Sequence, residues 1–445
     1  MVIKKEKSMK NILEEVKDAV IYQINLRVFT KEGTFAAAEK FLPDVAATGA
    51  DIVYLCSIAQ SDEEKDPSSW SMRQKRSLTN NPRNPYRLNN YFAIDEEYGG
   101  DEGLRSFVKK AHSLNLKVML DLVYGHCGPT FGKDHPSYVK RDENGNIKIN
   151  NYNFCSLDFS SPELREYLWY NMEYLVKEFD VDGYRCDVGA SVPLDFWVEG
   201  RRRVERIKKP FIMLDECEIQ SRKEDQDEAF DINYCQWWTQ HCFPAIFNSG
   251  MPAASLQIAY EEADEARNGA VLIRAIEHHD TANDMYYARV EKISSHKCEA
   301  SYVLCYTVPG VPFLYNGCEY SDTSRHSIFG KKGEFTIDRS KDPSERISFL
   351  ARLAELHRKE EALRNGTMLF FDNPAKGSLC TYVRTASNGE KILCIINLGN
   401  EKVSSELDIL SEFSSGKVLL ERGTQVNGKT LDIKENGFLV IKKEA

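Results

Sequence analysis

Four short apolar segments of this chain each end at an acidic residue, and this pattern limits the folds that the chain can adopt. The segments end at Asp121, Asp187, Glu216 and Asp280. Apolar runs of this length, separated by segments with helical periodicity, are typical of parallel strands that are buried on both faces. In a (β/α)8 barrel all such strands end at one rim, where active sites are built. The sequence therefore predicts an α/β barrel that brings these acids into one cleft.

Each acid could instead only cap the helix that follows its strand. Aspartate does this well because its side chain accepts hydrogen bonds from the first backbone N–H groups of a helix. Capping would explain any one of the acids alone. It does not explain why Arg185, His126 and His279 lie beside them in the sequence, so we favour a shared site.

The length and composition indicate a barrel with one small additional domain. The chain has 445 residues, of which 42% are hydrophobic and 28% charged, which is typical of a globular protein too long for one ordinary core. We expect a (β/α)8 TIM barrel over residues 1–365, with a short rim subdomain inserted after the third strand at about residues 125–158. Short alternating apolar and polar runs predict a C-terminal antiparallel β-sandwich domain over residues 366–445.

Residue patterns also predict the bounds of several elements. The first strand is expected over residues 20–29, followed by a helix over residues 35–48. Ser161 and Pro162 are suitable residues to begin the helix that continues to residue 179. A last amphipathic helix is expected over residues 344–363.

Charge and hydropathy exclude several classes of partner. The formal net charge of −10 argues against nucleic acid, because a phosphate backbone attracts basic surfaces. The longest apolar stretch, residues 303–315, contains two prolines and is too short to cross a bilayer. Residues 1–17 are charged throughout and lack the apolar centre of a signal peptide. We therefore expect a cytoplasmic protein that binds neither nucleic acid nor a membrane; its oligomeric state stays open.

The twelve cysteines form no regular pattern and no Cys-x-x-Cys pair, so we interpret them as reduced, mostly buried thiols. Cys127, Cys186 and Cys217 each follow or precede a candidate site residue, which raises the alternative of a metal site. Adjacent residues of a strand point to opposite faces. We therefore expect Cys186 and Cys217 to face the helix layer and not the cleft.

The segments around the acids resemble the four signature regions of the α-amylase family, glycoside hydrolase family 13. The resemblance extends over nearly the whole chain, and four regions in the right order are highly specific. It implies a barrel enzyme that acts on α-glucosidic bonds. The four regions and three further similar segments are residues 121–126, 183–187, 214–216 and 278–280, and residues 21–24, 85–91 and 309–319.

The resemblance implies a role for each acid. Asp187 would be the nucleophile, Glu216 the general acid/base, and Asp280 would bind sugar hydroxyls more tightly as the ring flattens in the transition state. Retaining glycoside cleavage independently requires two carboxyl groups roughly 5–5.5 Å apart. Arg185 lies two residues before Asp187, on the same strand face, and would keep that carboxylate ionised.

Further residues are expected to bind the same sugar. The resemblance implies that His126 and His279 donate hydrogen bonds to it, that Tyr86 stacks on its face, and that Asp121 supports the site from beneath. The pair Trp237–Trp238 could also stack on sugars, or could be a buried aromatic pair.

Three positions depart from the family pattern. Gly125 replaces an asparagine that often ligates calcium, and glycine offers no side-chain oxygen to a cation that prefers six to eight. We therefore expect no metal or other cofactor, although calcium could bind through other ligands. Ala190 and Ser191 replace a Lys-His pair that holds a long leaving glucan. Arg83 occupies a position where exo-acting α-glucosidases often have an acid.

The sequence thus predicts a retaining glycoside hydrolase that cleaves α-glucosidic bonds in α-glucans or malto-oligosaccharides, with a preference for short substrates. An α-glucosyltransferase, or a sucrose- or trehalose-type enzyme of the same family, is an alternative because the motifs are shared. A barrel that only binds sugar or serves as a scaffold is a third possibility. The presence of Asp187, Glu216 and Asp280 argues against it.

Overall fold

The computed structural model describes residues 15–217, 228–266, 271–282 and 289–445. Eight parallel strands close into a barrel, which confirms the predicted fold. Neighbouring strands in the barrel follow one another in the chain apart from short inserted strands. The barrel strands are β1 (Ile21–Ile24), β2 (Ile52–Leu55), β5 (Lys117–Leu122), β8 (Gly183–Cys186), β9 (Ile212–Asp215), β10 (Ile232–Asn233), β11 (Val271–Ala275) and β12 (Val311–Tyr315).

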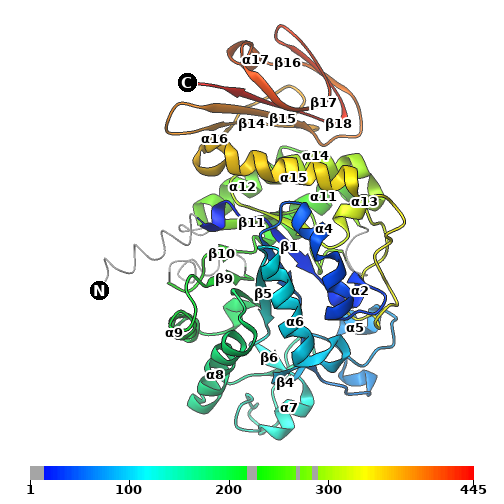
Figure 1. Cartoon of the computed structure of the whole chain (residues 1–445), viewed down its shortest axis with the longest axis vertical. Helices are drawn as coiled ribbons and strands as arrows, with labels where there is room; N and C mark the ends of the chain where they lie inside the picture. The colour runs from blue at the N-terminus through cyan, green and yellow to red at the C-terminus, as the bar shows by residue number, and fades with distance from the viewer. Residues whose placement is uncertain (1–14, 218–227, 267–270, 283–288) are drawn as a thin grey trace.

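Helices surround the barrel, and Figure 1 shows α6 and α8 on its outer face. Alternate strand residues separate two apolar cores. Ile21, Tyr54 and Phe313 fill the barrel interior, whereas Tyr22 and Val53 pack outward against the helices, as strand alternation requires.

In the part of the chain that the structure describes, no helix is both long enough and apolar enough to cross a membrane. The main helices are α6 (Gly100–Ser113), α8 (Pro162–Phe179), α9 (Leu194–Val204), α12 (Ser255–Ala266), α14 (Ser295–Thr307) and α15 (Ser344–Lys359).

Some predicted bounds were wrong. The first strand ends at Ile24 and not at residue 29, because Asn25 accepts a hydrogen bond from the backbone N–H of Arg27 and begins the short helix α2 (Leu26–Phe29). The helix expected over residues 35–48 is divided into α3 (Phe35–Ala38), one 3-10 turn and α4 (Leu42–Ala47). Pro43 lacks the N–H that a continuous helix would need.

The last predicted helix is also divided. α15 ends at Lys359, Glu360 is extended, and α16 covers Glu361–Asn365. The burial of the cysteines agrees with the prediction: all twelve lie in the described ranges and are buried thiols. Cys186 belongs to the apolar core outside the barrel, facing the helices.

An insertion follows β5, the third barrel strand. It contains β6 (His126–Cys127), which pairs with β7 (Cys155–Ser156), and the short helix α7 (Pro129–Asp134). In Figure 1 this insertion lies at the end of the molecule opposite the C-terminal sheet. It contributes His126, Tyr152 and Phe154 to the cavity described below.

The C-terminal antiparallel domain is confirmed, as one bent six-stranded sheet. The second half of β18 pairs with β15 and its first half with β16. Asn436 lies between these halves with a φ of 53°, so the strand changes direction and the sheet folds around a core that includes Leu393 and Leu431. The strands are β13 (Thr367–Phe370), β14 (Leu379–Thr385), β15 (Lys391–Asn397), β16 (Val403–Glu406), β17 (Lys417–Asn427) and β18 (Thr430–Lys443).

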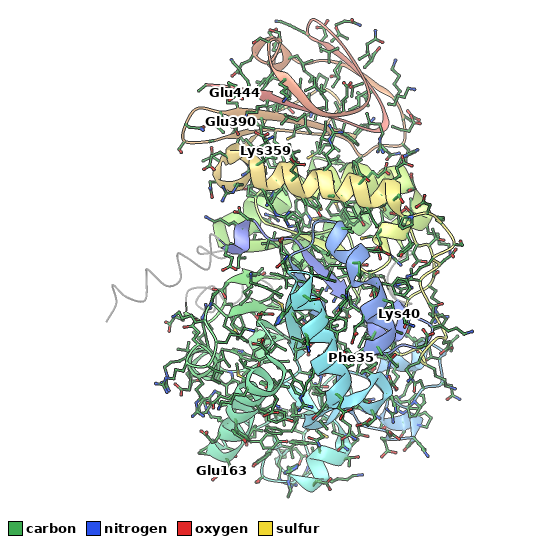
Figure 2. The ribbon with its side chains drawn as sticks, viewed as in Figure 1. Phe35, Lys40, Glu163, Lys359, Glu390 and Glu444 are labelled. Carbon is green, nitrogen blue, oxygen red and sulfur yellow. The ribbon has the colours of Figure 1, made fainter. Side chains whose placement is uncertain are left out.

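Charged contacts join this sheet to the barrel layer. Figure 1 shows α15 between the barrel and the sheet, and Figure 2 places Glu390 and Glu444 next to Lys359, at the end of that helix. Lys442 Nζ lies 2.8 Å from Glu360, 2.9 Å from Glu390 and 3.1 Å from Glu444. Lys442 thus connects the last strand to the turn between α15 and α16.

Candidate active site

The predicted acids meet at the carboxyl ends of the barrel strands. Asp187, Glu216 and Asp280 follow β8, β9 and β11 and line one cavity of about 270 Å³. This volume is close to the lower end of the range for small-molecule sites. Of the other predicted residues, Tyr86, His126 and His279 line the same cavity, whereas Asp121 and Arg185 are not among its lining residues.

Arg185 holds the acids together from below. Its side chain is fully buried, and its Nη1 lies 2.8 Å from Asp187 Oδ1 and 2.6 Å from Asp121 Oδ1. Its Nη2 lies 2.6 Å from Glu216 Oε2. One guanidinium therefore binds three carboxylates, and its planar shape fixes the position of Asp187 relative to Glu216.

The environment of Asp187 and Glu216 favours a shared proton. Burial raises the pKa of both carboxyl groups, and the positive charge of Arg185 lowers both pKa values but does not cancel the rise. Repulsion from Glu216 raises the pKa of Asp187 further. Two neighbouring carboxylates with a single cation cannot both ionise as readily as isolated ones. The pair therefore titrates as a unit and retains one proton to a higher pH than a solvent-exposed carboxyl group would.

A strained turn orients Glu216. Val188 has a φ of 42°, which is unusual for a β-branched residue. Its backbone N–H donates to Glu216 Oε2 at 2.9 Å, and Gln236 Nε2 donates to Oε1 at 3.0 Å. Strained backbone of this kind occurs at functional sites where the surroundings enforce it.

Asp280 forms an ion pair that the sequence patterns did not indicate. Arg73 Nη2 lies 2.8 Å from Asp280 Oδ1, and the Arg73 guanidinium lies over the ring of Phe329. Burial disfavours the charged form of Asp280, but His279 and the permanently charged Arg73 outweigh it and hold the pKa well below its usual range. Arg73 comes from α5 (Met72–Arg76), far from any signature segment, so only the structure reveals it.

His279 is fixed in one orientation and is neutral. Gln23 Oε1 accepts from the His279 backbone N–H at 3.0 Å, which directs the Gln23 amide nitrogen to Nδ1 at 2.7 Å. Nδ1 is then an acceptor, and Nε2 carries the proton. Nε2 lies 2.9 Å from the hydroxyl of Tyr86, which in turn donates to Asp121 at 2.9 Å. Burial lowers the pKa of His279 to about 3.

Tyr86 and His126 are also firmly held. The Tyr86 ring is stacked on His279 with an interplanar angle of 10°, and the His126 ring is stacked on Phe154. Burial lowers the pKa of His126 to about 4, and its Nε2 lies 2.9 Å from the backbone oxygen of Tyr86. The only N–H of the neutral His126 ring is thus engaged. In this arrangement Nδ1 is the ring atom left to accept a hydrogen bond.

Two of the departures from the family pattern meet in space. A Cβ atom at Gly125 would collide with Ser191 Oγ. The side chain of Ser191 therefore occupies the volume where an asparagine at position 125 would begin. The third departure lies elsewhere: Arg83 pairs with Asp95 at 2.8 Å and does not line the cavity.

Of the two neighbouring tryptophans, Trp238 is fully buried and Trp237 is 41% exposed, so they are not a buried pair.

Within the described ranges, His278, His279 and Asp280 form the one group with metal-ligand spacing. Two of its three residues are already engaged, because Gln23 occupies Nδ1 of His279 and Arg73 neutralises Asp280. We assign no metal to it.

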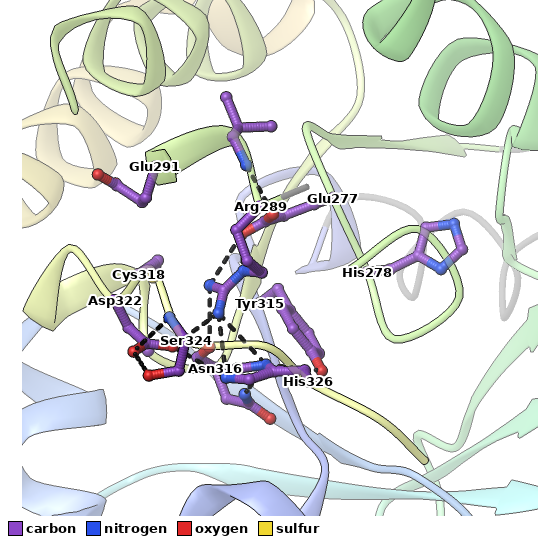
Figure 3. Close-up of polar contacts among 12 residues, drawn as sticks. Glu277, His278, Arg289, Glu291, Tyr315, Asn316, Cys318, Asp322, Ser324 and His326 are labelled. Atoms are coloured by element: carbon purple, nitrogen blue, oxygen red, sulfur yellow. Dashed lines mark hydrogen bonds and ion pairs between the residues drawn. The ribbon is translucent and has the colours of Figure 1, made fainter. Parts of the chain in front are cut away.

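A buried polar network supports the site from behind (Figure 3). Arg289 pairs with Glu277 at 2.9 Å and with Asp322 at 2.8 Å, and Asp322 lies 2.9 Å from Nε2 of His326. Glu277 follows β11, whereas Asp322 and His326 belong to the loop after β12. The network therefore fixes the loop that carries Phe329, the aromatic neighbour of Arg73.

Comparisons with known proteins agree with this geometry. The profile of the α-amylase catalytic domain matches residues 33–146. The structure of a noncanonic maltogenic α-amylase, AmyB from Thermotoga neapolitana, superimposes with a TM-score of 0.77 and 27% identity, covering 97% of this chain and 99% of that one. The chain therefore resembles the α-amylase family in one segment of its sequence and in the fold of nearly its whole length.

Curated relatives support this resemblance at lower coverage. A cyclomaltodextrinase from a Bacillus species is 25% identical over 438 residues, which cover 91% of this chain and 76% of that protein. A cyclomaltodextrinase from Geobacillus thermopakistaniensis is also 25% identical, but the chain spans only 58% of its length.

Proposed function

We propose that this protein is a retaining glycoside hydrolase that cleaves α-glucosidic bonds in short malto-oligosaccharides or cyclic maltodextrins. The observation that carries the proposal is the position of Asp187 and Glu216, which bind one buried guanidinium at the wall of one cavity. A retaining glycosidase requires such a pair of closely spaced carboxyl groups.

The proposed reaction has two steps. Asp187 attacks the anomeric carbon while Glu216 donates its proton to the glycosidic oxygen, so the leaving sugar departs as an alcohol and a glycosyl ester forms on Asp187. Glu216, now ionised, removes a proton from water, which attacks the same carbon and releases Asp187. The raised pKa of Glu216 favours the protonated form that the first step requires.

Asp280 is proposed to bind the hydroxyls of the sugar at the reacting carbon. Its depressed pKa keeps it ionised and therefore able to accept hydrogen bonds. Arg73 remains beside it and supplies donors to a neighbouring hydroxyl. Together with Phe329, Arg73 forms a wall of the cavity that limits how far a glucan chain can extend beyond this sugar.

Three observations support short substrates. The cavity is small, the wall formed by Arg73 restricts it, and Ala190 and Ser191 cannot grip a long leaving glucan. The similar proteins named above are a maltogenic amylase and cyclomaltodextrinases. The expected cytoplasmic location belongs to the same proposal, since short imported sugars would be the substrates there; cell fractionation tests it.

Product analysis on a substrate panel tests the proposal. Maltotriose and a cyclic maltodextrin should be cleaved with higher kcat/KM per bond than soluble starch, and proton NMR should show the first product with the α configuration. An inverted product would exclude double displacement. Transfer to sugar acceptors in place of water would instead indicate a glucosyltransferase. Turnover of sucrose or trehalose alone would indicate a disaccharide-specific enzyme, and absence of turnover on every substrate would indicate a barrel that only binds sugar.

A further inference from the structure

A second cavity lies at the opposite end of the barrel strands from the active site. It measures about 130 Å³ and lies where β11 and β12 begin, against the C-terminal sheet. In Figure 1 this is the boundary between barrel and sheet on the side of α16. Val271, Pro309, Gly310 and Gly366 supply part of its wall. None of these residues belongs to the catalytic machinery.

The charged side chains that line this cavity are all cationic. They are Lys17, Arg274, Arg364 and Arg384. Arg364 is paired with Asp18 at 2.6 Å, so its charge is balanced nearby. The two deeply buried arginines, Arg274 and Arg384, therefore decide the electrostatic character of the cavity.

Arg384 is buried completely, and in the described part of the chain its two Nη atoms donate to neutral groups. Its Nη1 donates to the backbone oxygen of Thr307 at 2.7 Å, and its Nη2 donates to those of Leu363 at 2.8 Å and Gly366 at 2.9 Å. These carbonyls accept hydrogen bonds but carry no net charge. Burial and the neighbouring Arg274 lower the pKa of Arg384 to about 10, so the side chain stays positively charged at neutral pH.

Arg274 is also buried, and its partners among the described residues carry no net charge. Its Nε donates to the backbone oxygen of Pro309 at 2.7 Å, and its guanidinium lies over the rings of Trp238 and Tyr260. Across the described residues, no carboxylate lies within ion-pair distance of Arg274 or Arg384. Buried charges in proteins are normally paired, so two neighbouring guanidiniums that have no acidic partner among the described residues make this cavity a favourable place for an anion.

We propose that this cavity binds a compact oxyanion of the phosphate class, either free phosphate or the phosphate group of a sugar phosphate. A doubly charged tetrahedral anion balances both guanidiniums, and arginine binds such oxyanions with directional hydrogen bonds. Arg274 belongs to the barrel, Arg384 to the C-terminal sheet. The anion therefore joins the two units, and its binding stabilises their assembly because it binds the folded protein alone.

Titration of the whole protein with inorganic phosphate at constant ionic strength tests the proposal. Calorimetry should show saturable binding of one phosphate per chain, and the melting temperature should rise with phosphate but not with equimolar chloride. Glucose 1-phosphate, titrated separately, distinguishes the sources: tighter binding than inorganic phosphate assigns a sugar phosphate, equal or weaker binding assigns free phosphate.

Variants locate the binding. Arg274→Gln should weaken phosphate binding at least tenfold, while Arg105→Gln, a substitution at an exposed arginine, and Arg73→Gln in the active site should leave it unchanged. Circular dichroism checks that each variant is folded. If Arg274→Gln fails to fold, Arg384→Lys replaces it. This second variant keeps the charge and should weaken phosphate binding less than tenfold. Absence of saturable binding, or loss of binding in Arg73→Gln alone, would overturn the proposal.

Discussion

At the residue scale, Asp187 and Glu216 share one counter-ion, and this arrangement makes a sharp prediction about activity. Asp187→Asn and Glu216→Gln should each lower kcat by at least about 10⁴-fold, because each removes a group that the reaction itself uses. Both variants should remain folded. A variant that keeps more than one hundredth of the wild-type kcat on maltotriose would contradict the assigned role. Glu102→Gln, at an exposed position of α6, is a suitable control.

The pKa shift of Glu216 also predicts how stability depends on pH. Burial raises this pKa, so the folded protein binds more protons than the unfolded chain between the ordinary and the raised value. The contribution of Glu216 to stability is therefore complete below the ordinary pKa of glutamate and is lost as the pH rises through the raised value. Urea unfolding at several pH values should show that wild type loses stability relative to Glu216→Gln over this interval. A constant difference would contradict the shift.

Arg73 offers a test of substrate size. If its guanidinium forms the wall beside Asp280, Arg73→Gln should open the cavity and lower kcat/KM on maltotriose by roughly tenfold, about 1.4 kcal/mol of transition-state binding. The same variant should lose less on soluble starch, so the ratio of the two values moves toward starch. Arg105→Gln is again the control. Equal losses on both substrates would mean that Arg73 only positions Asp280.

At the scale of elements, the loops after β5 and β8 explain why we expect calcium to be unnecessary. Ser191 fills the space next to Gly125, so the asparagine of the family pattern cannot be accommodated without a shift. Activity should be unchanged in excess chelator and should not rise with added calcium. Loss of activity that calcium restores would show that other oxygens of the insertion bind the ion.

The same contact predicts a coupled pair of substitutions. Gly125→Asn should lower the free energy of unfolding by about 1–3 kcal/mol, because it overpacks a filled site. Adding Ser191→Gly removes the obstructing side chain and should recover part of this loss. Chemical unfolding of both single variants and the double variant measures the coupling. Purely additive effects would show that the two positions do not interact.

Local patterns predicted the elements that depend on local forces. The barrel strands and the carboxylates at their ends follow from short apolar runs, and Ser161 begins α8 as expected. The sequence could not predict contacts between distant segments: Gln23 and His279 are 256 positions apart, and Arg73 reaches Asp280 from the short helix α5. The early end of β1 depends on one side-chain hydrogen bond of Asn25, which competes with strand formation and leaves no periodic signal.

At the scale of the whole molecule, Lys442 determines how firmly the C-terminal sheet is joined to the barrel layer. It lies between the carboxylates of Glu360 and Glu390, whose side chains are only 7% and 8% exposed. Removing one partner of a buried ion pair leaves the opposite charge unpaired, which costs more than the pair itself contributes. Lys442→Met would leave two such carboxylates facing each other.

We therefore expect Lys442→Met to lower the free energy of unfolding by about 2–4 kcal/mol, somewhat less than for a fully buried pair because Lys442 itself is 16% exposed. The neighbouring Lys443→Met is the matched control, since Lys443 is 38% exposed and its carboxylate partner is 3.8 Å away; its effect should stay within about 0.5 kcal/mol. Because the catalytic cavity lies at the carboxyl ends of the strands, away from this junction, kcat on maltotriose should be unchanged in both variants at temperatures where they are folded. Equal stability losses in the two variants would show that the burial of Lys442 does not matter. A fall in kcat of the folded Lys442→Met variant would show that the C-terminal sheet takes part in shaping the active site.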